Sequence, residues 1–148
     1  MAPIVASIEI DRPPDEVFSY VTDPSRLAEW QESVVRSRVE GGGTAGVGQR
    51  VRVTRRVGRR EQEMTAELAE LEPPTRWAVR GIDGPVRGDV NGTVEPIDAG
   101  ARSRVTITLD LHGHGIGKLL LPLVVRPQAR KEMVTNIRNL KQKLERAT

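Results

Sequence analysis

Residues 4–18 have the sequence IVASIEIDRPPDEVF, in which a strand pattern gives way to the start of a helix. Ile4, Ile8 and Ile10 fall on one face at a period of two, which predicts a half-buried strand. The prolines and carboxylates that follow are typical of a first helical turn, because proline lacks the N–H that would stay unbonded there and acidic side chains face the positive end of the helix dipole. The chain is therefore expected to begin with a strand and a short helix.

The rest of the chain returns to the strand pattern and ends in a helical one. A second short helix is expected to close at Trp30. Period-two segments then predict strands at 33–39, 49–57, 60–72, 75–82, 86–95 and 103–112. From about 117 to 146 the apolar residues follow helical spacing, although Pro122 and Pro127 predict a kinked or loosely packed first section. We expect an α+β fold, in which a curved antiparallel sheet of about seven strands closes around a long C-terminal helix.

Length and composition limit the classes of function. The 148 residues are expected to form one domain, spanning 1–148. The chain has no cysteine, which excludes disulfides, zinc sites built on thiolates and cysteine nucleophiles. It shows neither a secretory leader nor an apolar run of the about 20 residues that cross a bilayer. We therefore predict a cytoplasmic protein without stable membrane insertion.

The net charge is small, at +3, and the one dense basic cluster lies between Arg50 and Arg60. Glu61 and Glu63 follow this cluster at once, which is typical of a solvated hairpin. Nucleic-acid-binding proteins usually concentrate basic charge on one face. No nucleic-acid partner is therefore predicted.

Several loose motifs, taken together, carry a resemblance to a known family. They are IEIDRPPDEVF at 8–18, Asp23-Pro24, Trp30, LEPPTRW at 71–77 and LKQKLE at 140–145. In this order and spacing, the chain resembles the polyketide cyclase/dehydrase branch of the START-like (SRPBCC) superfamily over nearly its whole length. The fold of that superfamily is called the helix-grip, and its members hold apolar or amphipathic ligands between the concave face of the sheet and the last helix. The resemblance implies a ligand cavity but no single activity.

Arg55 is the clearest candidate for a polar group in such a cavity. It falls on the same side of its strand as Val53 and Val57, where a guanidinium can meet a carboxylate or phenolate of a ligand. The alternatives are that a bulge turns it to solvent or that it snorkels at the edge of the sheet. Gly88 and Gly92 indicate either a sharp bend or room left for a ligand.

The other residues expected to line the cavity are mostly aliphatic, since only 3% of the chain is aromatic. With Arg55, the expected ligand-binding residues are Trp30, Val53, Met64, Trp77, Val90, Leu109, Leu120, Val124 and Met133. Ordinary core packing is an equal alternative for the two tryptophans.

Asp110, His112 and His114 recur at every second residue, a pattern that can place metal ligands on one strand face. The neighbouring Leu109 and Leu111 are expected to take the buried face, so these polar residues should face outward. The resembled family also does not characteristically use a metal here. We predict no metal and no cofactor. No catalytic residue can be named, because nucleophile elbows, dinucleotide fingerprints and phosphate loops are missing from the sequence.

Residues 119–125, LLLPLVV, are too apolar for a simple surface helix. Three explanations are open: a lid or membrane-touching surface, a subunit interface in a homodimer, or packing onto the sheet within one chain. We favour packing within the chain and leave a homodimer open.

Three functions follow from these patterns. The first is a binding protein or carrier for a small hydrophobic or amphipathic molecule, lipid or polyketide-like. The second is a polyketide cyclase/dehydratase-type enzyme, in which Arg55 orients the substrate. The third is a regulatory or assembly domain that acts through its surface.

Overall fold

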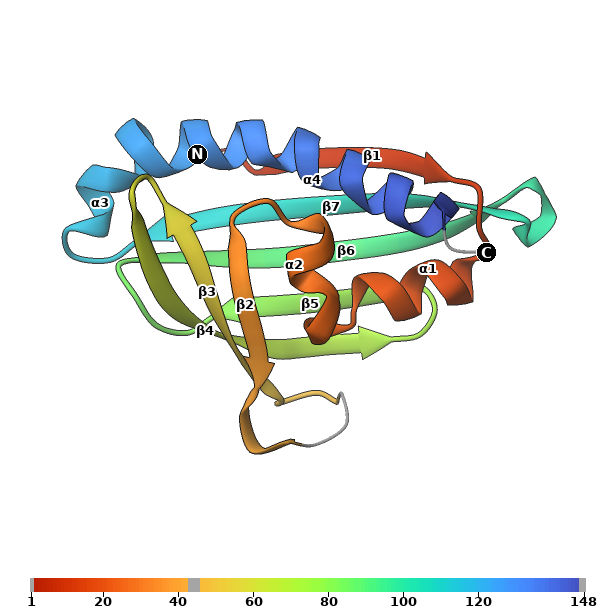
Figure 1. Cartoon of the computed structure of the whole chain (residues 1–148), viewed down its shortest axis with the longest axis horizontal. Coiled ribbons are helices and arrows are strands. Elements are labelled where there is room, and N and C mark those ends of the chain that lie inside the picture. Colours follow the sequence, from red (N-terminus) through yellow and green to blue (C-terminus); the bar gives the residue numbers. More distant parts are fainter. Residues whose placement is uncertain (1, 43–45, 147–148) are drawn as a thin grey trace.

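The computed structural model describes residues 2–42 and 46–146, except for the side chain of Leu120. The strands are β1 (Ile4–Ile10), β2 (Val34–Val39), β3 (Arg50–Val57), β4 (Arg60–Glu72), β5 (Arg76–Gly81), β6 (Val86–Ile97) and β7 (Arg102–Gly113). They form one seven-stranded antiparallel sheet in the order β1-β7-β6-β5-β4-β3-β2 (Figure 1). From β2 to β7 each strand pairs with the next along the chain, and β1 pairs with β7. The predicted sheet is confirmed.

Helices lie on one face of this sheet. They are α1 (Pro14–Val21), α2 (Leu27–Trp30), α3 (Gly117–Leu120), a π-helical turn η4 (Leu121–Val125) and α4 (Arg126–Arg146). Short 3-10 turns are η1 (Pro24–Arg26), η2 (Glu40–Gly42) and η3 (Asp98–Gly100). Helix α4 runs along β1 and contacts β1, α1 and α2 (Figure 1). Helix α1 begins with proline and carries two carboxylates in its first turn, as predicted.

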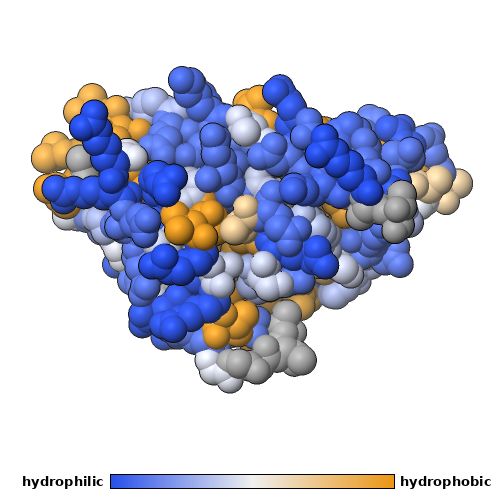
Figure 2. All heavy atoms as spheres, viewed as in Figure 1, coloured by the Kyte–Doolittle hydropathy of each residue, from blue (hydrophilic) through white to orange (hydrophobic). Residues whose placement is uncertain are grey.

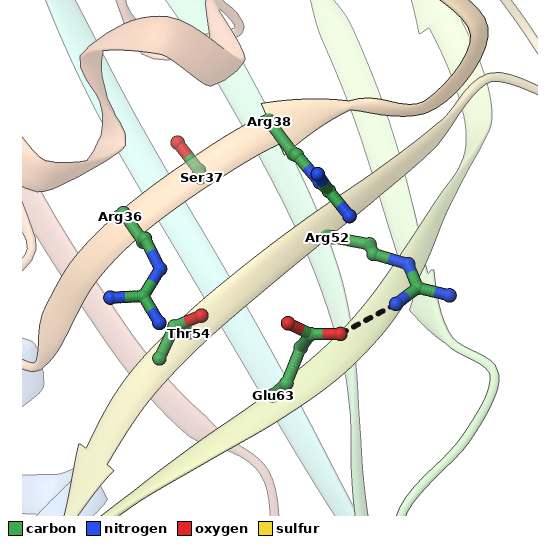
Figure 3. Close-up of a pocket in the computed structure, with 6 residues that line it drawn as sticks. All are labelled: Arg36, Ser37, Arg38, Arg52, Thr54 and Glu63. Carbon is green, nitrogen blue, oxygen red and sulfur yellow. Dashed lines mark hydrogen bonds and ion pairs between the residues drawn. The ribbon is translucent and has the colours of Figure 1, made fainter.

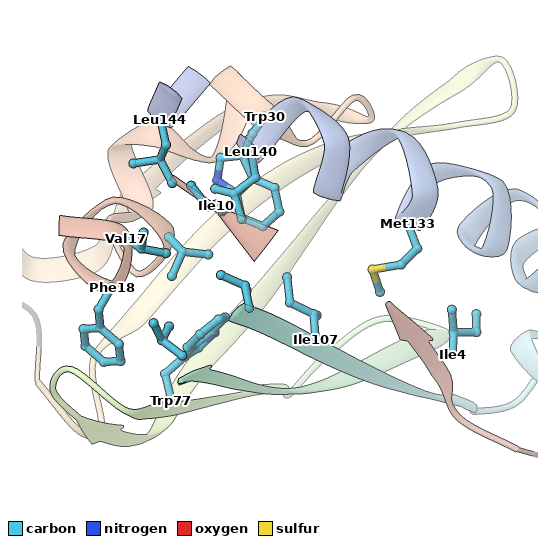
Figure 4. Close-up of a cluster of buried hydrophobic side chains, with 13 residues drawn as sticks. Ile4, Ile10, Val17, Phe18, Trp30, Trp77, Ile107, Met133, Leu140 and Leu144 are labelled. Atoms are coloured by element: carbon cyan, nitrogen blue, oxygen red, sulfur yellow. The ribbon is translucent and has the colours of Figure 1, made fainter. Parts of the chain in front are cut away.

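The hydrophobic core lies where α1 and the C-terminal half of α4 meet the sheet (Figure 4). The strand register brings Ile8 and Val94 to either side of Val105, so the apolar faces of β1, β6 and β7 form one surface. Leu140 and Leu144 of α4 are fully buried against it. The core therefore joins the first strand of the chain to its last helix.

The first section of the C-terminal helix is irregular because of its prolines. Pro122 and Pro127 have no backbone N–H to donate along the helix. The helix takes a π-helical turn over Leu121–Val125 before α4 continues it. The interruption predicted from the two prolines is confirmed.

The prediction that residues 119–125 pack onto the sheet is wrong for most of the segment. Leu121 alone is buried among the side chains described there. The exposed apolar side chains are Leu119, Leu123 and Val124. Successive residues of a helix point in directions about 100° apart, so a sheet on one side covers only some of a consecutive apolar run.

Candidate ligand-binding site

The concave face of the sheet, which faces α4, is fully buried at one end, whereas several of its side chains are only half-buried at the other. Val94 on β6 is 2% exposed, whereas Val90 on the same face of that strand keeps partial exposure. We call the buried part the closed end; it comprises Trp77, Val94, Val105 and Ile107. The half-buried part is the open end; it comprises Met64, Val79, Val90, Leu109 and Leu111.

The difference arises on the concave side, because the convex residues behind the two ends on β6 and β7 are alike in polarity and partial exposure. Thr93 and Thr106 lie behind the closed end, and Asp89 and Asp110 lie behind the open end. All four are only partly exposed. Solvent therefore reaches the aliphatic side chains of the open end from the side of the helix.

Trp77 fills the closed end by lying against Gly92 of the neighbouring strand. A Cβ atom at Gly92 would lie 2.2 Å from the indole ring, so only glycine leaves room for it. Phe18 of α1 meets the same ring edge-on, with 6.1 Å between the ring centroids. The idea that Gly92 leaves space for a ligand is therefore wrong, since the indole takes that space. Gly88, at the open end, faces the flexible tip of Leu109 instead.

Arg55 lies on the concave side of β3, beside the open end. The register shift lies in β2, between Val34 and Arg36, so β3 keeps its alternation and Arg55 is not turned outward. Its Nη1 donates to Ser33 Oγ at 3.1 Å, and its Nη2 donates to Gln31 Oε1 at 2.7 Å. Both partners come from the segment that links α2 to β2. The guanidinium is thus held in place by neutral oxygens.

The charge of Arg55 is not neutralised by a direct ion pair with any residue that the structure describes. The side chain keeps some solvent contact, but protein surrounds its guanidinium, and this desolvation lowers the pKa of Arg55. The carboxylate of Glu132 on α4 acts in the opposite direction and raises it. That carboxylate accepts a hydrogen bond from Gln128 Nε2 at 2.8 Å. A cation with only neutral hydrogen-bond partners suits an anionic group on a ligand.

The structure places the predicted lining residues in different environments. Val53, Met64, Val90 and Leu109 lie on the concave face, and Met133 faces it from α4. Trp30 and Trp77 belong to the hydrophobic core, where a contact with ligand stays a prediction. Val124 is exposed, and the side chain of Leu120 lies outside the described residues.

The polar neighbours of Arg55 were missed by the sequence patterns. Gln31 and Ser33 follow the second helix, and Gln128 and Glu132 lie one turn apart on α4. No local motif marks them, because only the folded sheet brings these segments opposite β3. The one signal that could have found them is their i, i+4 spacing, which puts Gln128 and Glu132 on one side of the helix.

A separate hollow of about 210 Å³ lies on the convex face, over β2, β3 and β4 (Figure 3). It is lined by Arg36, Ser37, Arg38, Arg52, Thr54 and Glu63. Arg52 pairs with both Glu40 and Glu63 at 2.6 Å, and Arg36 lies 3.8 Å from Glu61. Of the basic cluster noted in the sequence, Arg52 is neutralised by these pairs, and Arg50 pairs with Glu67 at 3.4 Å. We therefore place the candidate site at the open end rather than in this hollow.

Asp110 and His112 of the histidine and aspartate pattern lie on the convex face of β7, and His114 follows the end of that strand. His112 Nε2 lies 3.2 Å from Asp89 Oδ2, while Leu109 and Leu111 pack toward the core, as expected. Within residues 2–42 and 46–146, no group of three or more metal-ligating side chains is arranged to hold an ion.

Comparison with known proteins identifies the family. The sequence profile of the family described as "Polyketide cyclase / dehydrase and lipid transport" matches residues 1–145. The chain belongs to this family. The resemblance noted from the sequence motifs is thus confirmed, although no curated protein sequence matches the chain.

Several solved structures share the fold at low sequence identity. The protein TTHA0849 from Thermus thermophilus has a TM-score of 0.80 at 19% identity over 99% of both chains. The Zhui aromatase/cyclase from Streptomyces sp. R1128 has a TM-score of 0.73 at 19% identity, covering 97% of this chain and 93% of that one. A START superfamily protein from Mycobacterium smegmatis has a TM-score of 0.72 at 12% identity, covering 98% and 95%. The expected helix-grip fold is confirmed.

Proposed function

We propose that this protein binds a small amphipathic molecule non-covalently, as a carrier or binding protein. The apolar part of the ligand occupies the open end, and its carboxylate, phenolate or enolate oxygen meets the Arg55 guanidinium. The observation that carries this proposal is a cation without an ion pair among the described residues, set beside half-buried aliphatic side chains. Burying a charge is costly unless it is paired, and a ligand anion supplies the pair.

The chemistry of the lining supports an aliphatic or adaptable ligand. Met64, Val90 and Leu109 offer flexible or branched side chains and no ring for stacking. The family description includes both cyclases and lipid transport, which agrees with a ligand of either class. A small ligand that buries most of its surface against such walls, and is oriented by one polar group, fits the general design of binding sites.

A cyclase or dehydratase activity is the second candidate, favoured by the position of Glu132. Its carboxylate acts electrostatically on Arg55, so a base and a cation face the same region. In an enolisation, the carboxylate takes a proton from carbon while the guanidinium stabilises the oxygen that becomes anionic. On this alternative, Glu132→Gln removes turnover of a polyketide-like substrate but leaves ligand binding intact.

The test compares acids with their neutral analogues. Fatty acids and aromatic polyketide-like acids, each with its methyl ester, are titrated by calorimetry and by thermal shift. We expect the acids to bind roughly 10- to 100-fold more tightly than the esters, because a hydrogen bond to a charged group contributes about 1.5–3 kcal/mol. No binding by any member of the panel would contradict the proposal.

Arg55→Met is the decisive variant, and Arg56→Met is its matched control. Arg56 is the next residue and is exposed on the convex side. We expect Arg55→Met to bind acid and ester equally while Arg56→Met keeps the preference. The free energy of unfolding should change by no more than about 1 kcal/mol in Arg55→Met, because a methionine of similar volume replaces a charge that is costly to bury. An unchanged acid preference in Arg55→Met would refute the assigned role.

We also infer a cytoplasmic location and the absence of a nucleic-acid partner, and both stay predictions from the sequence. A surface-acting regulatory domain remains the third candidate and is favoured if every ligand fails.

A further inference from the structure

The junction of α3, η4 and α4 carries an apolar ridge that nothing in the described part of the chain covers. Its exposed side chains are Ile116 (66%), Leu119 (70%), Leu123 (79%) and Val124 (45%). Figure 2 shows hydrophobic side chains gathered at the end of the molecule that α3 occupies. Exposed apolar clusters of this kind mark surfaces that meet another molecule.

Basic residues surround the apolar ridge. Between residues 116 and 131 the sequence has four basic residues, Lys118, Arg126, Arg130 and Lys131, and no acidic one. A hollow beside the ridge is lined by Pro122, Arg126, Pro127, Arg130, Lys131 and Val134. Lys118, Arg130 and Lys131 form no ion pair with any described residue. Their charge is therefore available to a partner.

We propose that the apolar ridge and its basic rim dock on a bilayer that contains anionic phospholipids. The aliphatic side chains enter the boundary between headgroups and acyl chains, and the basic side chains meet lipid phosphates. Each basic residue near such a surface contributes about fivefold to the partition coefficient. The contact is peripheral: within the described ranges, no helix is both long and apolar enough to span a bilayer.

Charge complementarity selects an anionic surface over a second copy of this chain. In a twofold dimer each surface faces its own copy, so four basic residues would face the same four. Like charges brought together across an interface oppose association. A phospholipid surface offers negative charge together with an apolar layer at the depth that the ridge reaches.

The docking surface adjoins the open end. The backbone N–H of His114 donates to Pro85 O at 2.7 Å, which ties the segment before α3 to the β5–β6 turn. A Cβ atom at Gly117 would lie 1.8 Å from the same carbonyl oxygen, so α3 starts directly against this turn. A docked molecule thus holds its open end close to the bilayer. Ligand exchange with the bilayer rests on the proposed function, whereas the docking itself does not.

The test is co-sedimentation of the full chain with vesicles of phosphatidylcholine, with and without phosphatidylglycerol. We expect binding only to the vesicles that contain phosphatidylglycerol, weakened by added salt. Arg130→Gln/Lys131→Gln should weaken binding roughly 25-fold. The matched control is Arg138→Gln/Lys143→Gln, which removes the same charge from exposed positions further along α4. It should stay within about twofold of the unmodified chain.

The apolar contribution is tested by Leu119→Ser/Leu123→Ser, which should abolish binding. Val47→Ser, at an exposed valine outside the ridge, serves as control and should bind normally. Equal binding to both vesicle types, no binding to either, or equal losses in the two charge variants would overturn the proposal. A dimer in sedimentation velocity that the serine variant converts to monomer would also overturn it, in favour of a second copy. Arg55→Met should bind vesicles normally, which separates this proposal from the ligand site.

Discussion

The closed and open ends of the sheet share strands β5, β6 and β7, yet they differ in which side chains line them. At the closed end, Trp77 and Phe18 meet edge-on, and Trp30 belongs to the same buried cluster (Figure 4). The remaining aromatic residue of the chain, Tyr20, packs against the same core. At the open end the concave face has only aliphatic side chains and one arginine. The aromatic side chains thus lie in the core or pack against it, whereas the side chains that define the open end are aliphatic and only half-buried.

Of the variants that test this comparison, Gly92→Ala should lower the free energy of unfolding most. A methyl group there collides with the indole of Trp77, which must leave its place. We expect a loss of about 3 kcal/mol in the free energy of unfolding, at the upper end of the range for overpacked cores. Urea denaturation followed by tryptophan fluorescence measures it. Gly88→Ala is the control on the same strand, where the nearest contact is the flexible tip of Leu109, and it should cost less than about 1 kcal/mol. If Gly92→Ala and Gly88→Ala lowered the free energy of unfolding equally, the two ends would not differ in packing.

A second pair of variants compares like residues on β6. Val94→Ala should cost about 2 kcal/mol, because two buried methyl groups are lost and the packed surroundings cannot collapse onto the space. Val90→Ala should cost less than about 1 kcal/mol, since its side chain is partly accessible already. The same denaturation experiment measures both. If Val90→Ala proved the more costly, the open end would be a packed core.

The smallest expected effect concerns how the free energy of unfolding depends on pH through Glu145, near the C-terminal end of α4. Glu145 Oε2 accepts hydrogen bonds of 2.8 Å from Lys141 Nζ and from the Asp11 backbone N–H. These contacts, the lysine first, lower the pKa of Glu145 below its ordinary value of 4.5. Because the pKa is lower in the folded state, the stabilisation is complete above pH 4.5 and is lost as the pH falls through the folded pKa.

Glu145→Gln should therefore reduce stability at neutral pH by less than about 1 kcal/mol, because the pair is partly exposed. The difference from the unmodified chain should shrink in acid, as thermal unfolding at several pH values would show. If the stability difference grew in acid instead, a carboxylate other than Glu145 would control the pH dependence of stability.

The sequence predicted the sheet well because its strands alternate strongly. The same alternation put Arg55 on the concave side of β3, and the structure agrees because the bulge falls on β2. The partners of Arg55 could not be predicted, since Gln31 and Glu132 lie far apart in the chain. The exposure of Val124 was missed for a different reason: a π-helical turn changes which residues of the segment face the sheet.

The position of β1 in the sheet has a consequence for biosynthesis. Strands β2 to β7 leave the ribosome in the order in which they pair, so the meander can form as it is made. Strand β1 is made before all of them, but its Ile4 pairs with Leu109 on β7, and α4, which packs on β1, is made later still. Long-range pairing of this kind is slow, and until it occurs β7 presents an unpaired edge to other chains. Strand β1 is thus made before its partner β7 and is among the last strands of this sheet to find its place.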